Sequence, residues 1–222
     1  MKLTNTDPER NKRKSVIESS EFNDMLEATK EEAYSARKYY RIRDRALACV
    51  FYATGKRRGE VARLEVSDLE IKGKNLSITF TVLKKRKSGT LINRREKIIK
   101  IGSMVTPIIE YWEWMEDKVP GCKYLFPTTH YSPLSNTLVI RKGSHLSGRQ
   151  LLRRIQKMNP ESWCHLFRET MGAKVVRAKP DALAPFRVMN RLDLEDYKTA
   201  FNYFRRFAAD IIESEEIDLD EL

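Results

Sequence analysis

Apolar residues recur at helical spacing through much of this chain. Phe22, Met25 and Leu26 share one face of a helix that is expected to begin after a serine pair, a natural N-cap. Further helices are expected at residues 39–52, 58–64, 106–118, 151–155, 165–176 and 194–212, the last as one helix or a pair. The helix over residues 39–52 is apolar enough to be largely buried, and Gly55 ends it.

A change to a period of two predicts a β-hairpin. Apolar and polar residues alternate from Leu76 to Val82, which is typical of a half-buried strand. A second apolar run at residues 98–101 returns after a polar, basic connection over residues 84–95. The hairpin is therefore expected to have a basic tip. Loop signals dominate from residue 126 to residue 148.

Composition divides the chain into three parts. Residues 1–18 are polar and charged, as expected of a flexible arm or linker. Residues 19–212 carry the periodic segments and are expected to form the folded domain, because 222 residues that are 41% hydrophobic suffice for one substantial core or two small ones. Residues 213–222 form an acidic C-terminal tail.

Charge and cysteine content narrow the class of protein. A formal net charge of +11 favours a polyanionic partner, since lysine and arginine release condensed counterions when they neutralise phosphates. The three cysteines form no CxxC pair, which argues against a disulfide framework or structural zinc and for a reducing compartment. No secretion signal or long apolar span is present, so a cytoplasmic or nucleoid-associated protein without membrane contact is expected.

Two short basic motifs are candidates for chemistry. Arg57 follows the glycine that ends a buried helix, and Glu60 lies one turn later, where it can orient a guanidinium. His165 and Arg168 share one helical face, so both can reach one phosphate. The structural alternatives are a helix boundary with surface charges for the first motif and a satisfied core histidine for the second.

The hairpin and the last helix supply further candidates. The basic tip includes Lys85 and Lys87, either of which can protonate a leaving oxygen, follow a DNA backbone or simply be solvated. The last helix carries Tyr197 and Tyr203 in an aromatic stripe, a pattern more typical of a core than of catalysis.

These motifs, in this order, resemble the catalytic domain of the tyrosine recombinases, the phage integrase family. Residues 54–60 match the family's TGxRxxE turn, and residues 165–168 match its HxxR motif. Residues 87–89 are similar to its Lys-Ser/Thr-Gly hairpin, and residues 124–127 and 133–135 are similar to its linking segments. The resemblance extends from about residue 19 to residue 207.

The resemblance implies a mostly helical α+β fold with a small antiparallel sheet and a β-hairpin. It also implies site-specific cleavage and rejoining of double-stranded DNA through a 3′-phosphotyrosyl link, without metal, ATP or another cofactor. Arg57, His165 and Arg168 would bind the scissile phosphate, with His165 as phosphate ligand or proton acceptor. Tyr203 would attack, or Tyr197 in its place. Lys87 would be the acid, with Lys85 as the alternative.

The sequence departs from the family at two positions. Glu169 stands where the family usually has histidine, and Leu194 stands nine residues before Tyr203, where a histidine or tryptophan is usual. Arg191 is the candidate for the missing group, able to bind a phosphate oxygen but not to act as a base.

Other expectations follow from the same resemblance. A homo-oligomer, a tetramer on DNA, is expected, with the acidic tail either docked on a neighbouring protomer or solvated. Residues 1–18 are too short for the N-terminal DNA-binding domain usual in the family, as in a catalytic fragment or a minimal enzyme. The competing functions are a type IB topoisomerase, a non-catalytic DNA-binding protein of the same fold and a basic RNA-binding protein.

Overall fold

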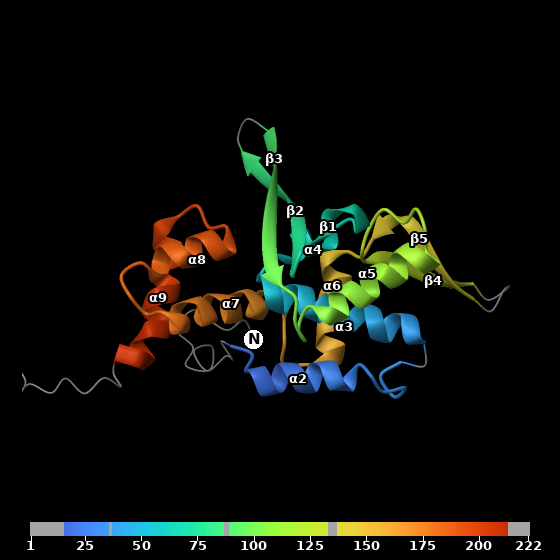
Figure 1. The fold of residues 1–222 in the computed structure, drawn as a ribbon, viewed down its shortest axis with the longest axis horizontal. Coiled ribbons are helices and arrows are strands. Elements are labelled where there is room, and N and C mark those ends of the chain that lie inside the picture. Colours follow the sequence, from blue (N-terminus) through green and yellow to red (C-terminus); the bar gives the residue numbers. More distant parts are fainter. Residues whose placement is uncertain (1–15, 36, 87–88, 133–136, 213–222) are drawn as a thin grey trace, which may run out of the picture.

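The computed structural model describes residues 16–35, 37–86, 89–132 and 137–212. Its helices are α2 (Ser19–Ala28), α3 (Lys38–Thr54), α4 (Arg58–Ala62), α5 (Thr106–Lys118), α6 (Gly148–Met158), α7 (Cys164–Ala178), α8 (Ala184–Leu192) and α9 (Tyr197–Ile212). Its strands are β1 (Leu69–Lys72), β2 (Asn75–Arg86), β3 (Gly89–Lys100), β4 (Pro127–Ser132) and β5 (Thr137–His145), with a 3-10 turn at Val66–Asp68. This mostly helical architecture with small antiparallel sheets confirms the expected α+β class (Figure 1).

The central helix α3 organises the larger of two hydrophobic cores. Residues 46–51 have no exposed surface, as expected from their apolar composition, and α3 packs against α5 and α7. Gly55 ends the helix in the left-handed region at φ +61°, where glycine is favoured. A Cβ there would lie 2.9 Å from atoms of Met171 and Leu192, so the turn after α3 approaches both α7 and α8 closely.

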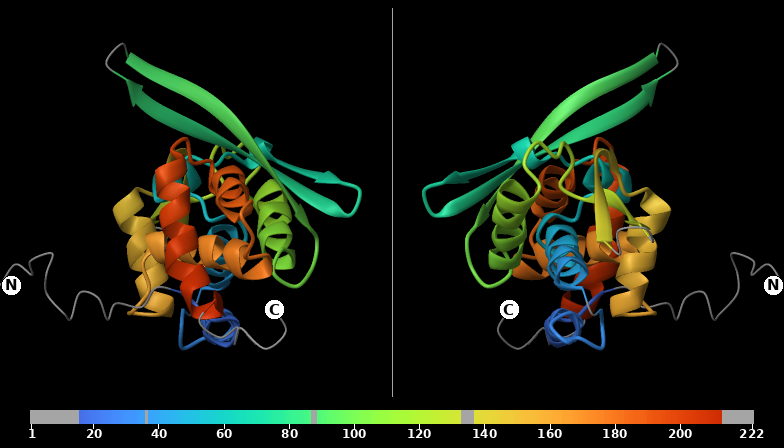
Figure 2. Two further views of the ribbon diagram at one scale, coloured as in Figure 1. Left: turned by 90° about the vertical axis from the view of Figure 1, so that its left-hand side faces the viewer. Right: turned by 90° about the vertical axis from the view of Figure 1, so that its right-hand side faces the viewer.

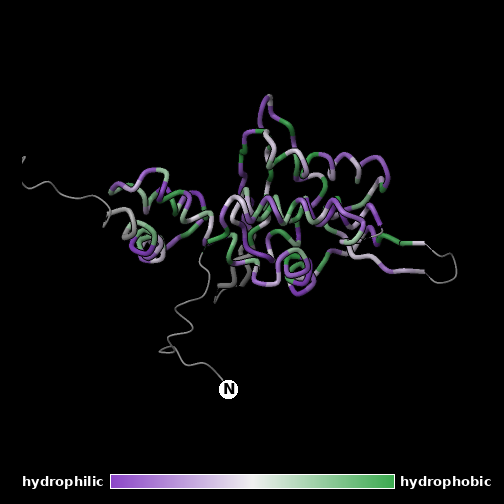
Figure 3. Tube along the Cα trace, turned by 90° about the horizontal axis from the view of Figure 1, so that it is seen from below, coloured by the Kyte–Doolittle hydropathy of each residue, from purple (hydrophilic) through white to green (hydrophobic). Residues whose placement is uncertain are grey.

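A second core joins α7, α8 and α9 at one side of the molecule (Figure 1). The tube changes repeatedly between hydrophobic and hydrophilic colours along these helices (Figure 3), and all three supply buried apolar side chains to this core, among them Val176, Val188 and Phe207. Pro185 lies in the first turn of α8, where the N–H that proline lacks would have no partner within the helix. Helix α7 contributes residues to both cores and therefore connects them.

The long β2–β3 hairpin projects beyond the helices (Figures 1 and 2). Its register runs from Asn75 opposite Lys100 to Arg86 opposite Gly89, so the expected polar connection over residues 84–95 is wrong: most of it is paired strand. The alternation stops at Val82, just before the basic run over residues 84–87, although the backbone pairing continues to Arg86 and Gly89. Strand β1 adds a third, unexpected strand, antiparallel to β2.

The second hairpin, β4–β5, was also not expected, because residues 126–148 carry loop signals. Its strands are exposed or half-buried along almost their whole length, so they lack the apolar alternation that reveals a strand buried on one face. Register irregularity near Pro127 further breaks the pattern. Hydrogen bonding between the strands, which composition does not report, holds this element together.

The folded unit begins slightly before the expected boundary. Ile17 is fully buried and its backbone N–H donates to Thr170 Oγ1 at 2.9 Å, and Val16 packs against the second core, so these two residues pack with the domain. The last helix begins at Tyr197, after an Asp196 cap that accepts from the Thr199 backbone N–H at 3.0 Å. The acidic tail over residues 213–222 lies outside the described residues. Among those described, no helix is long and apolar enough to cross a bilayer.

A buried ion pair lies within α3. Arg43 and Asp44 have fully buried side chains, with Arg43 Nη2 and Asp44 Oδ1 2.5 Å apart. Tyr34 donates its hydroxyl hydrogen to Asp44 Oδ2 at 2.8 Å, and the Arg43 guanidinium faces the Tyr40 ring at 4.8 Å. Removing one member would leave a buried charge without its partner.

We expect Asp44→Asn to lower the free energy of unfolding by about 3–5 kcal/mol, because Arg43 would lose its counter-charge inside the core. Urea denaturation measures the change. Asp117→Asn is the matched control, since Asp117 pairs with Lys118 on the surface and should contribute less than about 1 kcal/mol. Equal effects of the two substitutions would contradict this account.

Candidate active site

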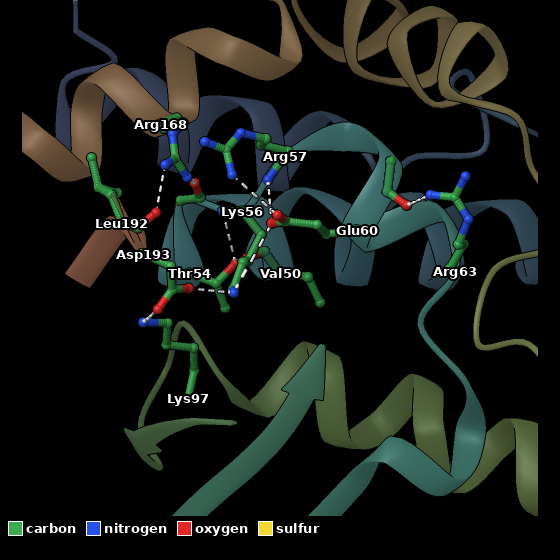
Figure 4. A network of polar contacts seen from close by, with 12 residues as sticks. Val50, Thr54, Lys56, Arg57, Glu60, Arg63, Lys97, Arg168, Leu192 and Asp193 are labelled. Atoms are coloured by element: carbon green, nitrogen blue, oxygen red, sulfur yellow. Dashed lines mark hydrogen bonds and ion pairs between the residues drawn. The ribbon is translucent and has the colours of Figure 1, made fainter. Parts of the chain in front are cut away.

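Arg57 is held at the start of α4 by Glu60. The Arg57 backbone N–H donates to Glu60 Oε2 at 3.0 Å, and its Nη1 lies 3.3 Å from Glu60 Oε1 (Figure 4). Glu60 is buried, whereas the Arg57 side chain is 51% exposed. The carboxylate therefore orients the guanidinium while leaving donors free toward a cavity of about 940 Å³.

Arg168 is buried between the two cores. Its Nη1 donates to the Gly55 carbonyl at 2.9 Å and its Nη2 to the Leu192 carbonyl at 2.5 Å (Figure 4). Burial lowers the pKa of Arg168, and the nearby positive charge of Arg57 lowers it further. Two neighbouring guanidinium groups favour an anion between or beside them.

His165 lies in the first turn of α7 and lines the same cavity as Arg57. Its side chain is 60% exposed. Partial burial lowers the pKa of His165; the Glu169 carboxylate opposes this shift, while Arg168 and Arg57 reinforce it. The neutral imidazole is therefore favoured at pH 7, ready to accept a proton.

Tyr203 on α9 packs against the backbone of α7. A Cβ at Gly172 would lie 2.4 Å from Tyr203 Cδ1, so only glycine permits this approach. Burial raises the pKa of Tyr203, while the positive charges of Arg168 and Arg57 act in the opposite direction. The phenol thus lies near both guanidinium groups. Tyr197, in contrast, is exposed and packs against Phe186 with ring centroids 5.2 Å apart.

Arg191 does not join this group. Its Nη2 donates to the Ala53 carbonyl at 2.8 Å, near the C-terminal end of α3, where a cation also complements the helix dipole. It lines a separate cavity of about 300 Å³ together with Lys100 and Lys174. Leu194, at the family's histidine position, lines the larger cavity instead.

Of the two candidate lysines in the β2–β3 hairpin, Lys85 is among the described residues and Lys87 is not. Lys85 is paired with Thr90 in the β2–β3 ladder, near the outer end of the hairpin.

A buried network beside the cavity was not anticipated from the sequence. Asp193 accepts from Lys56 Nζ at 2.5 Å and from Lys97 Nζ at 2.9 Å (Figure 4). Burial alone would raise the pKa of Asp193, but the hydrogen bonds from the two lysines outweigh it, and the pKa lies below its ordinary value. The sequence carried no signal for it, because Lys56 and Lys97 both lie in strongly charged stretches where a solvated lysine is the usual expectation.

Comparison with known proteins agrees with this arrangement. A model of the phage integrase family matches residues 15–209, which confirms the resemblance. The XerH site-specific recombinase bound to its difH substrate, in a pre-cleavage complex, has a similar fold, with a TM-score of 0.63 and 17% identity over 92% of this chain. The XerA recombinase gives 0.57 and 15%, also over 92%.

These solved proteins are longer than the present chain. The alignment covers 53% of the XerH recombinase and 68% of the XerA recombinase. At such identities the likeness concerns the fold. No curated protein matches the chain.

We expect Gly172→Ala to displace the Tyr203 ring, because the added methyl group would overlap two of its carbon atoms. Such overpacking should cost roughly 1–3 kcal/mol of unfolding free energy. Urea denaturation measures the cost, and tyrosine NMR shifts report the displacement. Gly102→Ala is the control, because a Cβ there meets no atom within 4 Å. An unchanged Tyr203 signal in Gly172→Ala would contradict the packing described.

Proposed function

The chain belongs to the phage integrase family, and we propose that it cleaves and rejoins DNA strands at a specific site through a 3′-phosphotyrosyl intermediate. The observation that carries the proposal is the gathering of Arg57, His165, Arg168 and Tyr203. Mutual electrostatic effects connect these groups although the motifs are more than a hundred residues apart. Double-stranded DNA is the proposed substrate, and a homotetramer on DNA the proposed assembly.

Phosphate binding is the first step. The exposed Arg57 guanidinium and the Arg168 guanidinium hold the non-bridging oxygens of one scissile phosphate. Their charges are already in place before DNA arrives, because Glu60 and two backbone carbonyls orient them. Such preorganised cations stabilise the extra negative charge of a pentacoordinate transition state.

Strand cleavage follows. The Tyr203 oxygen forms a bond to phosphorus as the bond from phosphorus to the 5′ oxygen breaks, and the phenolic proton passes to His165 or to solvent. Lys87 gives a proton to the departing 5′ oxygen. A 5′ hydroxyl from another duplex then reverses the reaction and releases Tyr203. One phosphoester replaces another, so no ATP is required.

The position of Arg191 favours a second candidate, a non-catalytic DNA-binding protein of the same fold. Its guanidinium is bonded to Ala53 and lines another cavity, so it does not replace the family's histidine or tryptophan at the larger cavity, where Leu194 stands. A binding protein would retain affinity for DNA, falling with salt, but form no adduct.

We expect Tyr203→Phe to abolish a covalent adduct that Tyr197→Phe retains, because the Tyr203 phenol lies near Arg168 and Arg57, whereas Tyr197 is exposed and packs against Phe186. The probe is a pool of nicked suicide duplexes of randomised sequence, incubated with EDTA. Adducts that survive SDS are captured and sequenced, which removes the need to know the site. Adduct formation by Tyr203→Phe would contradict the assignment. Salt-dependent binding by all variants with no adduct would support the binding protein.

A sulfur substitution identifies the acid. A duplex recovered from that pool is synthesised again with sulfur in place of the bridging 5′ oxygen of the scissile phosphate. The sulfur departs as a thiolate and needs no proton from an acid. We expect Lys87→Ala to cleave the oxygen substrate at least about 10²-fold more slowly, the usual contribution of general acid catalysis, and the sulfur substrate at nearly the normal rate. Lys85→Ala is the matched control. If instead Lys85→Ala, and not Lys87→Ala, cleaves the oxygen substrate slowly and the sulfur substrate at nearly the normal rate, the acid is Lys85.

A further inference from the structure

A single carboxylate connects His165 with the helix that carries Tyr203. Glu169 lies one turn after His165 on α7 and is 18% exposed. Its Oε1 is 3.8 Å from His165 Nε2, and its Oε2 is 3.7 Å from Arg206 Nη1. Arg206 follows Tyr203 by three residues on α9, so the two lie about one helical turn apart.

A carboxylate beside a phosphate-binding group of arginines is unfavourable for binding an anion. The negative charge of Glu169 partly cancels the positive charge of Arg168, the residue just before it in the chain. Glu169 is therefore not explained as a phosphate ligand. Its two neighbours are cations or can become cations, which points to a role in holding them.

The charged groups around His165 come from three elements. On α7 it faces Glu169 and Arg168, and at the start of α4 it faces Arg57. From α9, Arg206 pairs with Glu169, while Tyr203 is near enough for the Glu169 charge to raise its pKa. Of these groups, the Glu169 carboxylate favours an N–H on the imidazole nitrogen that faces it.

We propose that Glu169 is a positioning residue that holds His165 with its proton on Nε2 and ties it to α9. Because Nε2 faces the carboxylate, Nδ1 is left as the acceptor in the neutral ring. This inference rests on the proposed function, since it specifies how His165 would accept the proton lost by Tyr203. Arg206 limits the repulsion between Glu169 and the DNA phosphate.

The test is an NMR titration of the DNA-free protein with ¹⁵N-labelled histidine. The chain has three histidines, at positions 130, 145 and 165, and His165→Gln assigns the signal. We expect Glu169→Gln to lower the pKa of His165, because the carboxylate that favours the charged ring is gone. We also expect the nitrogen shifts to show a smaller fraction of the Nε2–H tautomer.

Two further variants separate electrostatics from disturbed packing. Glu161→Gln removes an exposed carboxylate just before α7 and should leave all three titrations unchanged. Arg206→Gln removes the competing cation and should raise the pKa of His165. An unchanged His165 titration in Glu169→Gln, or a fall in both Glu169→Gln and Arg206→Gln, would overturn the proposal.

Adduct formation then tests the functional part. Whether His165 acts as acceptor or ligand, the limb of the pH profile that it controls should move to lower pH in Glu169→Gln. A shifted titration with an unshifted adduct profile would overturn the positioning role while the proposed function stands. Failure of the unaltered protein to form any adduct would remove the proposed function, whatever the titration shows.

Discussion

The buried guanidinium of Arg168 is the interaction on which the rest of the arrangement depends. An unpaired charge inside a protein is costly, and this one is stabilised by the carbonyls of Gly55, which ends α3, and of Leu192 in the second core. Its two hydrogen bonds therefore join the turn after α3 to the end of α8. Asp193 strengthens the same junction by accepting from lysines on the turn and on β3.

This junction explains why the candidate site lies where it does. The turn after α3 supplies Arg57, α7 supplies His165, and α9 supplies Tyr203, so the site is assembled across the boundary between the cores. The close approach at Gly172 brings the phenol to α7. Cations gathered in this way repel one another, and an anion relieves that repulsion. The same electrostatics makes phosphate a suitable ligand and Glu169 a conspicuous exception.

Local patterns predicted the elements that bury one clear face. Helix α3, the inner half of the β2–β3 hairpin and the start of α7 were all visible as periodic apolar spacing. Strands β4 and β5 were not, because few of their positions are fully buried and apolar and polar residues do not alternate along their sequences. The outer half of the hairpin was missed because apolar and polar residues do not alternate over residues 83–92, whereas its register is a matter of backbone pairing.

The sequence by itself determined the chemical groups and their order: two arginines, a histidine and a tyrosine in motifs typical of one family. Only the tertiary structure decided which of the cations share a cavity. Arg191 was the candidate by its position in the sequence, yet its guanidinium binds the Ala53 carbonyl. Lys56 and Asp193, which were not predicted, line the larger cavity instead. The reason is physical: a long side chain binds the carbonyl or carboxylate nearest to it in space, and that distance is set by helix packing rather than by spacing along the chain.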